Sequence, residues 1–298
     1  MTLDQLKVFL AVAASQHVTR AAGELNMTQS AVSAAISALE ARYGVALFDR
    51  VGRGIVLTEA GRGFVPHAQA ILRRTREAEE FLADLEGGVA GPLRIQASQT
   101  VASYFLPPVL MAFHARYPRV QLALEQGNTT SVAQAVLSGE TDLGVVEGQV
   151  ALPDLDIEPI GGDRLMLLVG RDHPWADGRT LGIDDLASAD WVLREQGSGT
   201  RAAFDRALTA QGMALDTLSL LVELPSNEAC IAAIETGLAA TVLSELAAAP
   251  HRAQHLVVEA NFAFPSRAFS ILTHRQRHQS QAIRNFRDLL RAPIPQIR

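Results

Sequence analysis

Apolar residues recur at helical spacing through the first 45 residues of the chain. Residues 3–14 carry a stripe that predicts an amphipathic helix, formed by Leu6, Phe9, Leu10 and Ala13. Two shorter apolar patterns follow, over 19–25 and 29–43, and Thr28 between them is a good N-cap for the second. This spacing predicts two short helices joined by a tight turn, which is a helix-turn-helix.

The outer face of the second helix is small and hydrogen-bonding. It consists of Gln29, Ser30, Ser33, Ala34 and Ser37. Such residues allow close approach to the floor of a DNA major groove, where base edges offer donors and acceptors. The alternative at this point is the solvated face of an ordinary helical bundle.

Residues 45–57 form two short apolar runs around a glycine-containing turn. Arg53 stands between Gly52 and Gly54, which permit a tight turn. We therefore expect a two-stranded wing whose tip arginine can reach a phosphate or a narrow minor groove.

A long helix is predicted from Thr58, its N-cap, to about residue 85. Its apolar positions alternate in steps of four and three, as in a coiled-coil seam: Phe64, Ala68, Ile71, Thr75, Ala78, Leu82 and Leu85. At about 1.5 Å per residue the helix is roughly 40 Å long. We expect it to pair with the same helix of a second copy, and the alternative is a helix that lies along its own core.

Beyond a glycine- and proline-containing linker at 87–92, short β-runs alternate with helical segments. This alternation predicts βαβ units, a mostly parallel sheet and two α/β lobes, with the chain crossing between lobes near 161 and 267. Strands are expected over 93–97, 120–125, 142–147, 165–170, 191–194, 218–224, 239–243 and 269–273, and helices over 107–116, 132–138, 202–211, 228–236 and 281–291.

Composition limits the class of protein. The chain has 298 residues, a net charge of −6 and one cysteine, Cys230, so it has no disulfide framework and no thiolate metal cluster. The acidity argues against nucleic-acid binding, but it lies mostly beyond residue 58, where the predicted DNA-binding segment ends. No apolar run has transmembrane length and the N-terminus lacks the pattern of a signal peptide, so we expect a cytoplasmic protein.

An enzyme is the competing hypothesis. The pairs His251/His255 and His274/His278 have helical spacing, but neither has a cysteine or acidic ligand at a familiar distance. The GSGT segment lacks the lysine of a phosphate-binding loop, and no Gly-x-Ser-x-Gly elbow occurs. We expect no enzymatic activity and no cofactor. A cytoplasmic small-molecule-binding protein or α/β enzyme without DNA binding remains the alternative.

The whole chain resembles the LysR-type transcriptional regulators. The resemblance is carried by AAGELNMTQSAVSAAISALEARYGVALFDR, RGIVLTEAG, LPPVLMAFHARYPRVQLALEQGN, ETDLGVVEG and LREQGSGTR. It implies an α + α/β multidomain protein: a winged helix-turn-helix (1–58), a linker and dimerisation helix (59–86), a hinge linker (87–92) and a periplasmic-binding-protein-like effector domain (93–298). Lobe I would comprise about 93–161 and 268–298, and lobe II about 162–267.

The resemblance also implies partners and DNA contacts. The partners are operator DNA, a small-molecule effector, RNA polymerase and further copies of the chain, as a dimer through the linker helix and a homotetramer. The family's DNA face corresponds to Thr28, Gln29, Ser30, Ser33, Arg50 and Arg53. Where many members carry a long polar residue after the equivalent of Ser33, this chain has Ala34, which shifts weight to the wing and to DNA shape.

The family's effector site lies between the lobes and corresponds here to polar residues at strand ends and helix N-termini, which are ready anion sites. They are Ser98, Thr100, Asn128, Thr129, Glu147, Arg194, Ser198, Gly199, Thr200 and Ser226. Plain helix capping is the alternative for each. Glu147 would repel an anion unless it either faces away or contacts an arginine or an amino group on the effector. QGNTTSVAQAVLSGETDLGVVEG resembles regulators of sulfur assimilation and carbon fixation, so a small anion or compact metabolite is the effector hypothesis.

Overall fold

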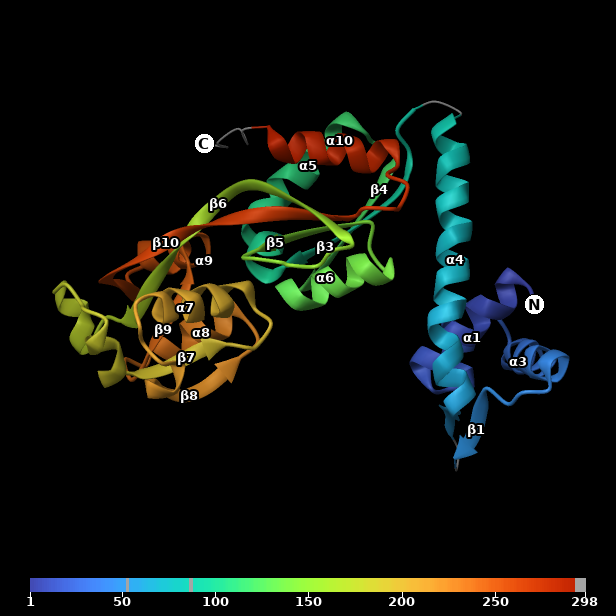
Figure 1. Ribbon diagram of the computed structural model, residues 1–298, viewed down its shortest axis with the longest axis horizontal. Coiled ribbons are helices and arrows are strands. Elements are labelled where there is room, and N and C mark those ends of the chain that lie inside the picture. Colours follow the sequence, from blue (N-terminus) through green and yellow to red (C-terminus); the bar gives the residue numbers. More distant parts are fainter. Residues whose placement is uncertain (52–53, 86–87, 293–298) are drawn as a thin grey trace. The chain divides into compact units, whose positions relative to one another are not determined.

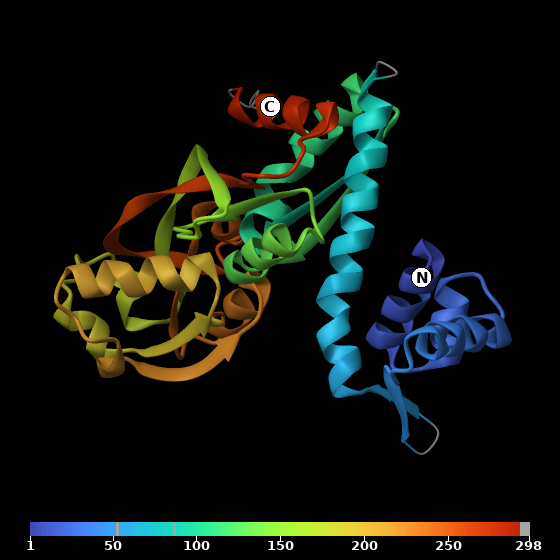
Figure 2. The ribbon, with the colours of Figure 1, turned by 45° about the vertical axis from the view of Figure 1, so that its right-hand side comes forward.

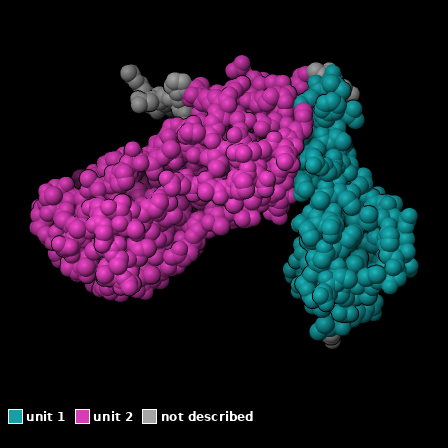
Figure 3. All heavy atoms as spheres, in the orientation of Figure 1, with its two compact units in different colours: residues 1–85 teal, residues 86–298 magenta. Residues whose placement is uncertain are grey.

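The computed structural model describes residues 1–51, 54–85 and 88–292. The chain divides into two compact units, Met1–Leu85 and Glu86–Arg298 (Figure 3). Within the described ranges, no helix combines the length and the apolar character that crossing a membrane requires.

The first unit begins with three helices, α1 (Leu3–Ser15), α2 (Val18–Glu24) and α3 (Gln29–Tyr43). Local capping explains where α3 starts and stops. The Thr28 hydroxyl accepts a hydrogen bond from the Ala31 N–H at 3.2 Å. At the other end Gly44 ends the helix with φ +66°, a left-handed conformation that glycine adopts without strain. The predicted helix-turn-helix is thus present in the structure.

Aromatic packing holds the three helices to the elements that follow. Phe9 of α1 is fully buried, and its ring centroid lies 5.4 Å from that of Phe48 and 5.0 Å from that of Phe64. Around these rings pack the apolar faces of the three helices, including Leu6, Val12, Ala21, Val32, Ile36 and Leu39. The stripe on α1 therefore forms the core under the helix-turn-helix.

Two short strands form the wing, β1 (Phe48–Val51) and β2 (Gly54–Leu57), which pair antiparallel. Arg53, at the predicted tip, lies outside the described residues. The Thr58 hydroxyl accepts a hydrogen bond from the Gly61 N–H at 2.9 Å and so starts the next helix. A Cβ at Gly61 would lie 2.1 Å from the Leu47 carbonyl oxygen, so only glycine permits this close approach of helix and wing.

Helix α4 (Glu59–Leu85) is continuous over 27 residues (Figure 2). Its first turns belong to the core of the unit, where Ala68 is fully buried and Phe64 packs. The apolar positions beyond them are largely exposed: Ile71 37%, Phe81 50%, Leu82 62% and Leu85 69%. The helix therefore lies along its own domain only at its N-terminal end.

The second unit contains one eight-stranded sheet, in the order β4-β3-β5-β10-β6-β9-β7-β8. Its strands are β3 (Gly91–Ser98), β4 (Val120–Gly127), β5 (Leu143–Glu147), β6 (Leu155–Gly170), β7 (Asp190–Arg194), β8 (Ser219–Leu224), β9 (Ala240–Ser244) and β10 (Val257–His274). Its α-helices are α5 (Leu106–Arg116), α6 (Thr129–Ser138), α7 (Gly199–Ala210), α8 (Asn227–Ile234), α9 (Glu245–Ala253) and α10 (Gln281–Arg291). Helix α9 was not predicted, and it contains Pro250.

The expectation of a mostly parallel sheet is wrong at the centre. The pairs β3–β4, β3–β5, β7–β8 and β7–β9 are parallel, but β6 and β10 run antiparallel to each other and to their outer neighbours. These two strands have 16 and 18 residues and pass through both halves of the sheet (Figure 1). Only their apolar stretches were predicted, because Gly161, Gly162 and Pro265 interrupt the pattern elsewhere.

The sheet thus has two halves with separate cores. We call lobe I the half with β3, β4 and β5, where Phe113 of α5 meets Phe286 of α10 edge-on at 5.1 Å. Figure 1 shows α5 and α10 on one side of this half and α6 on the other. We call lobe II the half with β7, β8 and β9, where Trp191 and Phe204 pack at 5.0 Å.

Candidate DNA-binding face and effector cleft

The predicted DNA-binding residues within the described ranges all lie on the surface of the first unit. Thr28, Gln29, Ser30 and Ser33 are exposed at the N-terminal end of α3, and Arg50 is exposed on β1. The Thr28 and Ser30 hydroxyls are 3.0 Å apart, so these two side chains form one polar cluster at the helix start. Buried Val32, Ile36 and Leu39 hold the opposite face of α3.

A groove of about 350 Å³ lies between α3 and the wing. It brings Arg50 of β1 together with Gln29 and Ser33 of α3. Its other lining side chains include His17 and Thr19, at the start of α2. Sequence reasoning did not select these two, although their position beside the N-terminus of a short helix was a usable signal.

Glu40 fixes the wing relative to α3. One of its carboxylate oxygens accepts hydrogen bonds from the backbone N–H groups of Leu47 at 2.7 Å and Phe48 at 3.1 Å. A carboxylate in a DNA-facing groove would oppose phosphate binding. Here the two N–H donors partly offset its charge, and the side chain positions the strand that carries Arg50.

In the second unit, the predicted effector residues meet where the two lobes face each other. Ser98, Thr100, Thr129, Glu147, Arg194, Ser198, Gly199 and Thr200 are buried, and Asn128 and Ser226 are partly buried. Asn128, Ser198 and Ser226 cap α6, α7 and α8 through hydrogen bonds to the backbone. Capping therefore accounts for these three side chains without a ligand.

Glu147 is the centre of one part of this cluster. It is 1% exposed; its carboxylate accepts a hydrogen bond from the Ser98 hydroxyl, and its other oxygen lies 4.0 Å from Nη1 of Arg267. The Thr129 hydroxyl donates to the Glu147 carbonyl oxygen at 2.9 Å. Of the two alternatives stated above, the structure therefore has Glu147 turned inward toward an arginine.

Arg194 is the centre of the other part. It is buried in lobe II, where its guanidinium binds both carboxylate oxygens of Glu195, at 2.8 and 3.1 Å, and donates to Asn227 Oδ1 at 2.6 Å. Asn227 in turn donates from Nδ2 to the Thr100 hydroxyl of lobe I at 3.3 Å. The charge of Arg194 is therefore paired inside the protein and is not free for an effector.

A third set of contacts between the lobes involves residues that sequence reasoning missed. Gln99 accepts from the Asn227 N–H at 2.8 Å and donates to Glu228 at 2.6 Å, and the Tyr104 hydroxyl donates to Glu228 at 2.8 Å. Partial burial, the hydrogen bond and the charge of Glu228 raise the pKa of Tyr104. Gln99 stands between two predicted residues in the Ser98–Thr100 segment, and that position was the available signal.

Glu228 keeps its charge in this contact. Partial burial alone would raise the pKa of its carboxyl group, but hydrogen bonds from its own backbone N–H and from Tyr104, Gln99 and Ser226 hold that pKa below its ordinary value. The two lobes are thus joined through a carboxylate that is ionised at neutral pH.

The charge of the interlobe cluster is negative on balance. Glu147, Asp163, Glu195 and Glu228 contribute four carboxylates, whereas Arg194 and Arg267 contribute two guanidinium groups. Arg201, the other arginine beside the GSGT segment, binds Asp205 at 2.9 Å and Glu223 at 3.2 Å. Over residues 88–292 the cluster therefore has no cationic side chain in excess with which to attract an anion.

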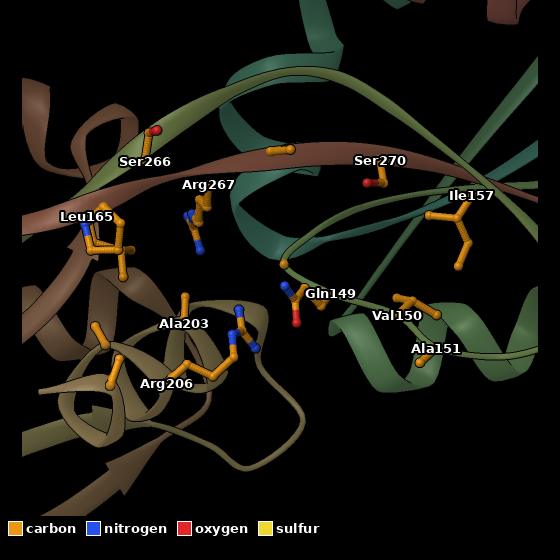
Figure 4. Close-up of a pocket in the computed structure, with 15 residues that line it drawn as sticks. Gln149, Val150, Ala151, Ile157, Leu165, Ala203, Arg206, Ser266, Arg267 and Ser270 are labelled. Atoms are coloured by element: carbon orange, nitrogen blue, oxygen red, sulfur yellow. The ribbon is translucent and has the colours of Figure 1, made fainter. Parts of the chain in front are cut away.

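An open cavity of about 580 Å³ lies beside this cluster, and none of the ten predicted effector residues lines it. Its walls come from the segment after β5, the middle of β6 and β10, and one face of α7 (Figure 4). Polar side chains in the walls are Gln149, Arg206, Ser266, Arg267 and Ser270, and the rest of the lining is mainly aliphatic. Sequence reasoning missed it because its walls meet only after the two long strands pair.

The histidine pairs do not assemble a metal site: in the described part of the chain, no group of three His, Cys, Asp or Glu side chains is placed so that it could hold a metal ion. His251 Nδ1 lies 3.8 Å from Glu235, and His274 Nδ1 accepts a hydrogen bond from the Gln276 N–H at 3.2 Å.

Two family models match the chain, one in each of its two units. The model for bacterial regulatory helix-turn-helix proteins of the lysR family matches residues 3–62, and the model for the LysR substrate binding domain matches residues 86–293. The chain belongs to the LysR family. The resemblance noted in the sequence is confirmed, and this LysR-type chain is a transcriptional regulator with a DNA-binding and an effector-binding domain.

Relatives of this LysR-type chain are similar over nearly their whole length. The uncharacterized HTH-type transcriptional regulator YeiE of Escherichia coli (strain K12) is 36% identical over 97% of this chain and 96% of its own. The RuBisCO operon transcriptional regulator of Allochromatium vinosum is 35% identical over 97% and 95%. The relatives are named as regulators and not as enzymes, and the second agrees with the resemblance to regulators of carbon fixation.

Solved structures have the same fold. Full-length CbnR in complex with its target DNA has a TM-score of 0.72 at 23% identity, and covers 98% of this chain and 99% of its own. The regulatory domain of Synechocystis PCC6803 CcmR in complex with 2-PG has a TM-score of 0.63 at 27% identity, over 70% of this chain and 99% of its own. The predicted multidomain fold class is confirmed.

Proposed function

We propose that this LysR-type regulator contacts operator DNA through Thr28, Gln29, Ser30 and Ser33 of α3 and through Arg50 and Arg53 of the wing. The observation that carries the proposal is the groove in which Gln29, Ser33 and Arg50 face the same space. Gln and Ser can bond base edges in a major groove, and an arginine on the adjacent strand can neutralise a phosphate.

We propose the domain boundaries stated from the sequence, with 1–58 for DNA binding, 59–86 as the dimerisation helix, 87–92 as the linker and 93–298 for effector binding. Exposed apolar residues beyond the middle of α4, such as Leu82 and Leu85, support pairing with a second copy. In the effector domain the edge strand β8 exposes Leu220, Leu221 and Val222, at 41%, 55% and 41%. This edge supports a further contact between copies and hence a homotetramer.

We propose that a small molecule with an anionic group binds between the lobes and changes their closure, and with it DNA bending. The hydrogen bonds from Gln99, Tyr104 and Asn227 across the lobes give the closed arrangement a defined set of contacts that a ligand can favour or disfavour. The ligand-bound regulatory domain of CcmR supports small-molecule binding. The regulator would act in the cytoplasm, on promoters transcribed by RNA polymerase.

Footprinting of the full-length chain on its own promoter DNA tests this function. Ser33→Arg should change operator affinity and base preference, because it places a long cation in the groove. The matched control is Arg42→Ala, an exposed position on the last turn of α3 outside the groove, which should leave the footprint unchanged. An S33R footprint identical to wild type in position and affinity would contradict the proposed face.

A further inference from the structure

The cavity of about 580 Å³ beside the interlobe cluster has the size of a small-molecule site, for which about 300–1,000 Å³ is typical. It opens between the residues that follow β5 in lobe I and the face of α7 in lobe II (Figure 4). A ligand in this cavity would therefore contact both lobes, as a ligand that changes their closure must.

Arg206 gives this cavity a free positive charge. No residue that the structure describes forms a hydrogen bond or ion pair with its guanidinium, although every other arginine around the lobe junction has a carboxylate partner. The group reaches from α7 to lobe I, because a Cβ placed on Gly148 would lie 3.8 Å from Nη2 of Arg206. Figure 4 shows it extending toward Gln149.

Arg267 borders the same cavity, but its charge is already paired. It is 8% exposed, and its guanidinium binds both carboxylate oxygens of Asp163, at 2.6 and 3.0 Å. Among the residues that the structure describes, the cavity thus has one unpaired cation, Arg206, while the adjacent buried cluster has more carboxylates than guanidinium groups. An anionic group is attracted to the first place and repelled from the second.

The remaining walls are apolar and accommodate a hydrocarbon body. Ala203, Ala207 and Ala210 share one face of α7, and their small side chains leave volume open in front of the helix. Leu165 and Ile157 of β6 also line the cavity. Ligand sites of this kind combine a mostly apolar lining with a few polar groups that fix orientation.

We propose that this cavity binds a small monocarboxylate with an aliphatic or aromatic body, whose carboxylate pairs with Arg206. Gln149 and Ser270 stand at the same cavity as further hydrogen-bond partners. The inference rests on the proposed function, since it assigns the chemical class and the place of the effector. It differs from the predicted site, because the binding group lies on α7 and not at the buried helix N-termini.

Calorimetric titration of the full-length chain with hexanoate tests the site, with 1-hexanol and hexylamine as probes of equal length and sulfate as an anion without an apolar body. Hexanoate should bind at least ten times more tightly than the other three. Arg206→Gln should lower hexanoate affinity by about 10-fold or more, as expected for a lost charge-assisted hydrogen bond. Gln149→Glu should do the same, because the new carboxylate would pair with Arg206.

The control variant is Arg171→Gln, which removes another exposed arginine of the effector domain outside the cavity and should leave hexanoate binding unchanged. Equal hexanoate affinity in wild type and R206Q, or equal binding of hexanoate and 1-hexanol, would overturn the proposal. The titration contains no DNA, so absence of hexanoate binding in a chain that still footprints its promoter would reject the cavity ligand alone. A chain that binds hexanoate but no promoter DNA would instead reject the proposed regulatory function.

Discussion

Arg267 and Asp163 form a two-point ion pair in the middle of the two strands that connect the lobes. Their atoms meet at 2.6 and 3.0 Å, both residues are buried, and they are direct partners in the β6–β10 register. The Ser244 hydroxyl also donates to Asp163, and Arg267 donates to the Thr200 hydroxyl at 3.0 Å. One ion pair thus joins β6, β10, the end of β9 and the start of α7.

Removing one partner of this pair should therefore be costly. Asp163→Ala leaves a buried guanidinium without its carboxylate, and we expect the free energy of unfolding of the effector domain to fall by about 3–5 kcal/mol. Urea unfolding followed by tryptophan fluorescence measures this, because both tryptophans, Trp175 and Trp191, are buried in lobe II. The double variant D163L/R267M should lose less than D163A; an equal or larger loss would contradict the argument.

Gly199 lies at a close contact between the two lobes. A Cβ there would be 2.3 Å from the Glu147 carbonyl oxygen and 2.5 Å from the Thr129 hydroxyl. Gly199→Ala should therefore force the lobes apart and lower the free energy of unfolding by about 1–3 kcal/mol. Gly182→Ala is the control, since its Cβ would meet only Asp185 Oδ2 at 3.7 Å. If G199A and G182A unfold at the same urea concentration, the close packing of Gly199 against Glu147 and Thr129 would be contradicted.

Glu40 should contribute both to the stability of the first unit and to DNA binding. Glu40→Ala removes the acceptor of the Leu47 and Phe48 N–H groups, so we expect a loss of about 1–3 kcal/mol in the stability of the first unit. The wing strand that carries Arg50 would also lose its fixed position, and promoter affinity should fall. Thermal melts and gel shifts of the full-length chain measure the two effects. Full promoter affinity in E40A would show that the wing needs no such anchor.

Arg50 should contribute to DNA affinity without reading bases. Arg50→Ala should weaken binding of operator and unrelated DNA to a similar extent and reduce the slope of log K against log salt by about 1 per chain. Gln29→Ala should instead cost about 1–3 kcal/mol on the operator alone. Salt titrations by fluorescence anisotropy separate the two. An unchanged salt slope in R50A would remove Arg50 from the phosphate contacts.

Acid should weaken the attachment of α10 to the sheet. The hydrogen bond and charge of Arg291, together with those of Arg287, lower the pKa of Glu158 to about 2 against the opposing effect of burial. Because this pKa is lower in the folded chain, its contribution is complete above the ordinary pKa of about 4.5 and disappears as pH falls toward 2. Glu158→Gln should therefore flatten the fall in stability between pH 5 and 2. Parallel stability curves for both proteins would contradict this.

Local patterns in the sequence determined the first unit. The helical stripe with Phe9, the cap at Thr28, the glycine at 44 and the long seam each depend on residues a few positions apart, and the structure contains the corresponding elements. The same holds for most strands and helices of the effector domain and for the family resemblance, because propensities and caps act over short stretches of chain.

Several contacts at the effector cleft span more than 100 residues. The pairing of β6 with β10 brings Asp163 to Arg267, and lobe closure brings Gln99 to Asn227 and Glu228. No local pattern specifies that Arg267 pairs with Asp163, which lies 104 residues earlier in the chain. The sequence by itself therefore identified the polar strand ends. Only the tertiary structure decided that Glu147 turns inward to Ser98 and Arg267, and that Arg206 has no partner among the described residues beside an open cavity. The physical reason is that the charge available to a ligand is what remains after all spatial neighbours, near and distant in sequence, have neutralised each other.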